Sequence, residues 1–186
     1  SAFDLYHARL EEALELGDRI AVLNAGRIEQ IGTPFEVYNY PETEYVATFL
    51  GAANLLLGII NGQNFETGDV FLRLHEDANF RDGQSVKLVF RPEDVFLRKP
   101  ENLTREYQRL TDGTVEEVNF VGAFERVVVR LNLPDRQPIV VTRPKSETSE
   151  FPLEAGQRVV AGLVRFRILP NFTLASERAS RMIDAN

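Results

Sequence analysis

Basic residues in the second half of the chain have the types and spacing of an anion site. Arg165 and Arg167 alternate with apolar residues, so on a strand both side chains would leave the same face. An arginine presents a planar fork of donors that matches a sulfate or phosphate group. The candidate oxyanion site therefore comprises Arg143, Lys145, Arg165 and Arg167, with Arg178 and Arg181 expected nearby. The alternative is a solvated polar face that pairs with the many carboxylates.

A second group of charged residues could act as an acid/base cluster. Arg91, Glu93 and Asp94 stand close together around a proline, between two segments that look like strands. Proline and aspartate are typical of turns, so the alternative is a solvated turn without chemistry. The sequence favours the turn.

Thiol and metal chemistry find little support in the composition. The 186 residues include no cysteine, and His7 and His75, the two histidines, are far apart. The net charge of −7 argues against a general affinity for nucleic acid, whose phosphates favour basic partners. No apolar run approaches the roughly 20 residues that a membrane-spanning helix needs. A content of 44% hydrophobic residues is enough for a sizeable core.

The first fifty residues predict a mixture of helices and a hairpin. Gly26 lies between two short apolar segments, and glycine supplies the positive φ of a tight turn. Thr33 to Glu36 reads as a capping box, with a proline at the first helical position. Pro41 ends that helix, and a second short helix is expected before Gly51, a plausible C-cap.

From Asn54 onward the pattern has a period of two. The segments are short, rich in β-branched and aromatic residues, and separated by turn residues. Gly83-Gln84 and Gly156-Gln157 each lead into a strand, which suggests two related strand sets. We therefore predict a mainly β fold, an OB-like barrel over residues 52–186, preceded by a small α+β segment over residues 1–51.

The sequence also resembles a known family along most of its length. The stretch "EEALELGDRIAVLNAGRIEQIGTPFEVYNYPETEYVATFLG", residues 11–51, is similar to the end of the nucleotide-binding domain of bacterial ABC importer ATPases. The segments "FRPEDVFL", "FVGAFERVVVRL" and "GQRVVAGLVRFRILP" resemble the TOBE regulatory domain that follows in such proteins. The resemblance implies residues 1–51 as the end of the first domain and 52–186 as the TOBE domain.

The resemblance implies ATP and magnesium as ligands of the parent protein, yet this sequence has no phosphate-binding loop, no Leu-Ser-Gly-Gly signature and no Walker B strand. We therefore expect no catalytic residue, cofactor or metal in these 186 residues. The family has a switch histidine three residues before the first glutamate of its Glu-Glu-Ala helix, and His7 is the candidate. His7 precedes Glu11 by four residues, so an ungapped match places Ala8 at the switch position. The alternative is an ordinary terminal histidine.

The resemblance further implies a regulatory and dimerising role. The expected partners are a second copy of the subunit and the membrane permease, which would place the protein at the cytoplasmic face of the membrane. The sequence is most similar to importers of sulfate, thiosulfate or similar oxyanions, while iron, polyamine and sugar importers share the same tail. A module that senses a small oxyanion directly is the competing function; no nucleic acid is expected.

Overall fold

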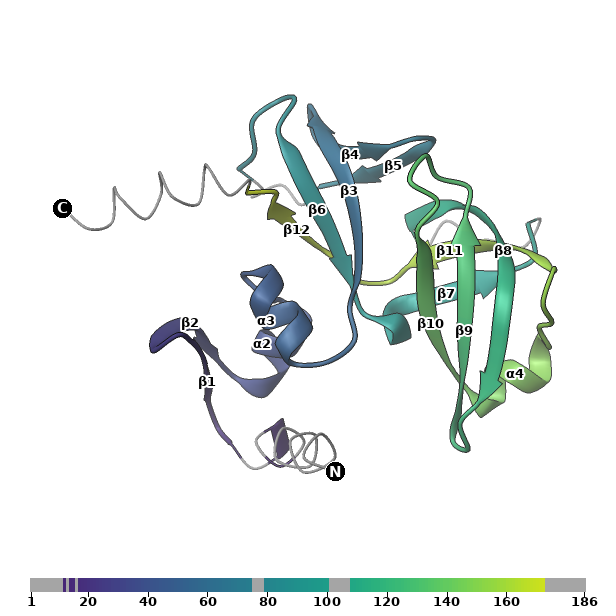
Figure 1. Cartoon of the computed structure of the whole chain (residues 1–186), viewed down its shortest axis with the longest axis horizontal. Coiled ribbons are helices and arrows are strands. Elements are labelled where there is room, and N and C mark those ends of the chain that lie inside the picture. The colour runs from purple at the N-terminus through teal and green to yellow at the C-terminus, as the bar shows by residue number, and fades with distance from the viewer. Residues whose placement is uncertain (1–11, 13, 16, 75–78, 101–107, 173–186) are drawn as a thin grey trace.

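The computed structural model describes residues 12, 14–15, 17–74, 79–100 and 108–172. A small hairpin and two short helices come first in the chain, and the later strands form two five-stranded sheets. Figure 1 shows that these sheets are curled and lie against each other. The predicted mainly β fold class is confirmed, because the described strands beyond the hairpin form two five-stranded antiparallel sheets. His7, His75, Arg178 and Arg181 lie outside the described residues.

The N-terminal hairpin forms as its turn residues predict. Strands β1 (Ile20–Asn24) and β2 (Arg27–Gly32) pair antiparallel. Ala25 and Gly26 join them with φ values of 48° and 77°. Positive φ at both central residues is the pattern of a type I′ turn, whose twist suits a two-residue hairpin.

Helices α2 (Pro34–Asn39) and α3 (Glu44–Phe49) follow the hairpin. Thr33 closes the predicted capping box, since its side chain accepts from the Glu36 amide and the Glu36 side chain accepts from the Thr33 amide. The second helix ends one residue earlier than expected, because Leu50 is its C-cap and Gly51 follows with a φ of 147°. The hairpin and the helices share a small core of Val22, Val37, Val46 and Leu50.

The first five-stranded sheet has the order β12-β6-β3-β4-β5. Its strands are β3 (Asn54–Asn61), β4 (Asn64–Thr67), β5 (Val70–Arg73), β6 (Ser85–Phe90) and β12 (Arg167–Pro170). Strand β3 is long and central, and its partners β4 and β6 flank it. The sheet therefore combines early strands of the chain with the last described one.

The second sheet has the order β10-β9-β8-β11-β7. Its strands are β7 (Val95–Arg98), β8 (Gln108–Phe120), β9 (Phe124–Leu131), β10 (Pro138–Pro144) and β11 (Arg158–Leu163). A 3-10 turn, η1 (Pro92–Asp94), leads into β7, and a short helix, α4 (Lys145–Glu150), follows β10. The two predicted glycine-led repeats both precede strands, β6 and β11, one in each sheet.

One hydrophobic core joins the two sheets. It contains Phe65 and Leu72 from the first sheet and Val127, Val129 and Leu163 from the second. No described helix is long and apolar enough to cross a membrane.

Candidate functional site at the joint between the helices and the sheets

Arg91 connects the N-terminal helices to the sheets. It follows β6 directly, and only 3% of its surface is exposed. Its Nε and Nη2 atoms donate to the Tyr38 carbonyl at 3.2 and 3.0 Å, and its Nη1 atom donates to the Ala47 carbonyl at 2.7 Å. Nη1 also donates to the carbonyls of Ala52 and Gly51, at 3.0 and 3.3 Å. One side chain thus binds four backbone carbonyls on α2, α3 and the following linker.

These carbonyls explain why a buried cation is tolerated there. Tyr38 and Ala47 lie in the last turns of α2 and α3. The carbonyl groups there lack partners within the helix, and the helix dipole places a partial negative charge at this end. The guanidinium also lies 4.1 Å from the centre of the Tyr38 ring. Burial lowers the pKa of Arg91, but an arginine remains charged in proteins. Arg91 therefore acts as a shared C-terminal cap for two helices.

Tyr38 makes a second connection across the joint, by which we mean the contact of α2 and α3 with residues 91–94 and the sheets. Its hydroxyl donates to the Glu93 carboxylate at 2.5 Å. Burial raises the pKa of Tyr38, and the hydrogen bond to Glu93 raises it further, so the phenol stays protonated and remains a donor. Helix α2 is thus bound on both sides of the Arg91-Pro92-Glu93 corner.

Asp94 and Arg165 form the third connection. The Arg165 guanidinium donates to the Asn39 side-chain oxygen at 2.8 Å and lies 3.8 Å from an Asp94 carboxylate oxygen. It also lies 5.3 Å from the centre of the Phe35 ring. Burial raises the pKa of Asp94, and the positive charge of Arg165 partly offsets this rise. Arg165 therefore links α2 to the segment between β11 and β12.

Apolar residues fill the remaining contact. Ala47 of α3 packs with Val89 of β6 and Leu169 of β12 in a separate buried cluster. The cavity between Tyr38, Arg91, Asp94 and Arg165 has a volume of about 10 Å³. This is room for roughly one water molecule. The joint is therefore a packed contact, without room for a ligand.

The expected turn at residues 91–94 is present as η1, and Glu93 is exposed, but the turn as a whole is not solvated as expected. Arg91 is buried, and the Asp94 side chain is only 14% exposed. The cause is the packing of α2 and α3 on this corner, which local sequence does not reveal. The charged groups bind the helices, and the cavity between them holds about one water molecule. The alternative, an acid/base cluster, therefore has no open cavity for a substrate here.

The structure separates the residues of the predicted oxyanion site. Arg143 is 1% exposed and donates to Glu125 Oε2 at 2.6 and 3.0 Å, and to the Phe151 carbonyl at 2.9 Å. Lys145 is exposed at the first residue of α4. Arg143 and Arg167 belong to different sheets. Within the described ranges, no hydrogen bond or ion pair joins any two of the four residues, and the oxyanion site stays a prediction.

The alternation expected of Arg165 and Arg167 also needs correction. Strand β12 begins at Arg167, so Arg165 precedes the strand and is held by Asn39 instead. Arg167 is exposed. The period-two rule holds only within a strand, and the strand boundary fell between the two arginines.

Three curated relatives resemble a large part of this chain. The Spermidine/putrescine import ATP-binding protein PotA of Oleidesulfovibrio alaskensis is 36% identical over 161 residues, which are 80% of this chain and 42% of the relative. PotA of Mycoplasma capricolum is 44% identical over 71% of this chain and 36% of the relative. The Sulfate/thiosulfate import ATP-binding protein CysA 2 of Chromobacterium violaceum is 38% identical over 80% of this chain and 40% of the relative. The chain thus spans about two fifths of the length of these relatives.

The chain was also compared with protein-family models and with solved structures. No family model matches the chain. A solved structure of the cytoplasmic molybdate-binding protein ModG has a TM-score of 0.49 and 16% identity, over 62% of this chain and 94% of that one. The homologues of this chain are ATP-binding proteins of ABC importers.

Proposed function

We propose that this chain is the regulatory C-terminal region of the ATP-binding subunit of an ABC importer. In this proposal residues 1–51 end the ATP-binding domain, and residues 52–186, with the two sheets, form the regulatory domain. The relatives support it, because they are import ATP-binding proteins, and the contacts between the helices and the sheets support it as well. The observation that carries the proposal is Arg91, because a single buried side chain directly after β6 holds both helices of the preceding segment.

The outer face of the hairpin supports the same assignment. Leu23 and Ile28 pair across β1 and β2 and are 56% and 59% exposed. Phe35 on the adjacent helix is 57% exposed. A hairpin with apolar residues on both faces is typical of a strand pair that packs inside a larger domain. We propose that the rest of the ATP-binding domain covers this face.

The joint gives the proposed regulation a physical route. A movement of α2 and α3 has to break the Arg91 contacts or carry the sheets along. A partner or ligand that prefers one arrangement would then shift the subunit by its difference in affinity, typically about 1–3 kcal/mol. The partners we propose are a second copy of the subunit and the membrane permease at the cytoplasmic face. ATP and magnesium would bind the ATP-binding domain of the whole protein.

The imported solute is part of the proposal. The relatives include both sulfate/thiosulfate and spermidine/putrescine importers. We propose a solute from these two classes, and uptake assays with both distinguish them.

A chimeric subunit tests the proposed function. In it, this chain replaces the matched segment of the Chromobacterium violaceum relative, and the importer is assayed for ATP hydrolysis and for uptake of sulfate and spermidine. We expect uptake in the chimera and a lower ratio of uptake to hydrolysis after Arg91→Met. Arg126→Gln is the matched control, because Arg126 is exposed on β9 away from the joint. A chimera whose uptake and hydrolysis are the same for Arg91→Met and for the control would contradict the coupling role.

A further inference from the structure

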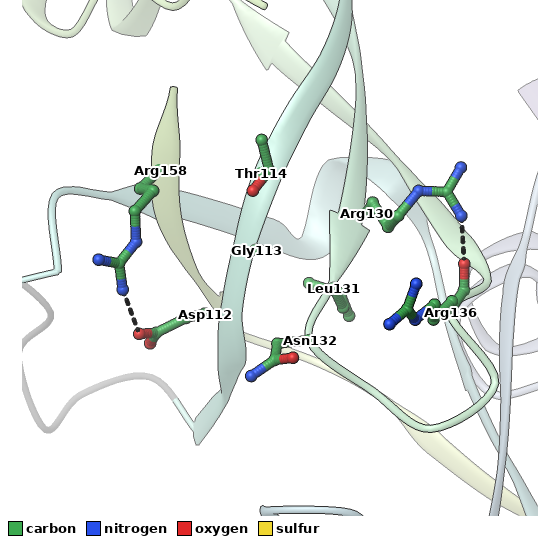
Figure 2. Close-up of a pocket in the computed structure, with 8 residues that line it drawn as sticks. All are labelled: Asp112, Gly113, Thr114, Arg130, Leu131, Asn132, Arg136 and Arg158. Atoms are coloured by element: carbon green, nitrogen blue, oxygen red, sulfur yellow. Dashed lines mark hydrogen bonds and ion pairs between the residues drawn. The ribbon is translucent and has the colours of Figure 1, made fainter. Parts of the chain in front are cut away.

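An open cleft lies on the second sheet, away from the joint. It has a volume of about 310 Å³ and is formed by β8, β9, β11 and the turn after β9. Figure 2 shows Arg158 and Asp112 on one side of this cleft and Arg130 and Arg136 on the other. Its lining residues are Asp112, Gly113, Thr114, Arg130, Leu131, Asn132, Arg136 and Arg158.

The lining is positively charged in an acidic chain. Three arginines against one aspartate give the lining a formal charge of +2, whereas the whole chain carries −7. Clefts lined by one sign of charge concentrate ligands of the opposite sign. An anion is therefore the favoured occupant.

Arg136 is the arginine that is most available to a ligand. Its backbone has a φ of 48°, which is uncommon for a residue with a side chain, and its carbonyl accepts a 2.6 Å hydrogen bond from Arg130 Nη1. Within the described part of the chain, the Arg136 guanidinium has no hydrogen-bond or ion-pair partner. Glycine would adopt this backbone more easily than arginine does. Arg136 therefore occupies a position where the backbone conformation favours glycine.

On the opposite wall, the Arg158 side chain can also turn from Asp112 to a ligand. Arg158 is 75% exposed and lies 3.5 Å from Asp112, a long contact. Asp112 is also paired with Arg109 at 2.5 Å. If Arg158 turned to an anion, the Asp112 carboxylate would keep a partner. Arg130 is less free, because its Nε atom binds Glu116.

We propose that this cleft binds a small phosphorylated metabolite. Its phosphate would lie against Arg136, within reach of Arg158, and its hydroxyl groups would bond with Asp112, Asn132 and Thr114. The volume is at the lower end of small-molecule sites, about 300–1,000 Å³, so a bare tetrahedral anion would leave much of the cleft to water. This site is independent of the proposed function and of the predicted oxyanion residues.

Calorimetric titration of the 186-residue chain tests the site. The probes are glucose 6-phosphate and glycerol 3-phosphate, with inorganic phosphate, sulfate and glucose as smaller or neutral comparisons. We expect saturable binding of at least one organic phosphate, weaker binding of the inorganic anions, none of glucose, and lower affinity as salt rises. Arg136→Gly should weaken binding roughly tenfold or more without lowering the melting temperature. Arg126→Gln on β9 should change neither.

Several outcomes would overturn this site. They are the absence of saturable binding for both organic phosphates, equal affinity for inorganic and organic phosphate, and an unchanged dissociation constant in Arg136→Gly. Arg158→Gln is the second variant, since Arg158 is mostly exposed and its loss should leave the fold intact. If Arg136→Gly unfolds, unchanged binding in Arg158→Gln overturns the proposal, and a severalfold loss supports it.

Discussion

The Nη1 atom of Arg91 donates a 2.7 Å hydrogen bond to the carbonyl oxygen of Ala47, which lies 44 residues earlier in the chain. The same guanidinium binds the carbonyl of Tyr38 through two other nitrogens. Helices of six residues are too short to be stable alone, so α2 and α3 depend on tertiary contacts. We infer that Arg91 fixes the position of both helices relative to the sheets.

Removing the Tyr38 hydroxyl should weaken the joint modestly. Tyr38→Phe keeps the ring beside Arg91 but loses the hydrogen bond to the Glu93 carboxylate. We expect the free energy of unfolding, measured by urea denaturation near neutral pH, to fall by about 1–2 kcal/mol. Tyr40→Phe is the control, since the Tyr40 side chain is 41% exposed. Equal stabilities of the two variants would contradict the assigned role of the hydroxyl.

Asp94 should make the stability depend on pH. Burial raises its folded-state pKa above the ordinary value of 3.8, so the folded protein holds this proton more tightly than the unfolded chain does. The stability that this group contributes is therefore fully present below the unfolded-state pKa and is lost as pH rises through the folded-state pKa. Asp94→Asn cannot titrate.

The comparison with Asp94→Asn isolates this effect from the other carboxylates. The free energy of unfolding of the unmodified chain minus that of Asp94→Asn should decrease as pH rises from roughly 3.5 to 7. Urea denaturation at several pH values measures it. A difference that stays constant or increases with pH would show that Asp94 is not buried as described.

Removing one partner of the buried pair Arg143 and Glu125 should lower the free energy of unfolding strongly. Their side chains are 1% and 6% exposed. Arg143→Met leaves the Glu125 carboxylate without its cation, and we expect a loss of about 3–5 kcal/mol in unfolding free energy. Arg143→Met with Glu125→Leu should be more stable than the single variant, as denaturant titrations can determine. A double variant less stable than Arg143→Met would argue against an uncompensated charge as the cause.

Local features of the fold were predictable from the sequence. The Thr33–Glu36 capping box and the turn at Gly26 each depend on residues a few positions apart, and both are found. The period-two pattern from Asn54 onward likewise predicts the strands, because it reflects which side of a strand faces a core. The mainly β fold follows from such local signals.

The candidate site was not predictable in the same way. Arg91 was noticed in the sequence, but its partners lie 39 to 53 residues away and depend on how α2 and α3 pack on the sheets. Arg143 was grouped with other basic residues, whereas its partner Glu125 comes from the neighbouring strand. Charge alone does not tell a ligand-binding arginine from one paired inside the protein, since the pairing is set by tertiary structure.

Hydrogen exchange in Arg91→Met tests the central claim most directly. The amides of Val37, Ala47 and Leu50 donate within α2 and α3, and the strand β9 amides serve as an internal reference. We predict that the helix amides lose protection relative to β9 in Arg91→Met and keep it in the control Arg126→Gln. Helix amides that remain as protected as in the unmodified chain, with β9 unchanged, would contradict the conclusion that Arg91 holds the two helices to the sheets.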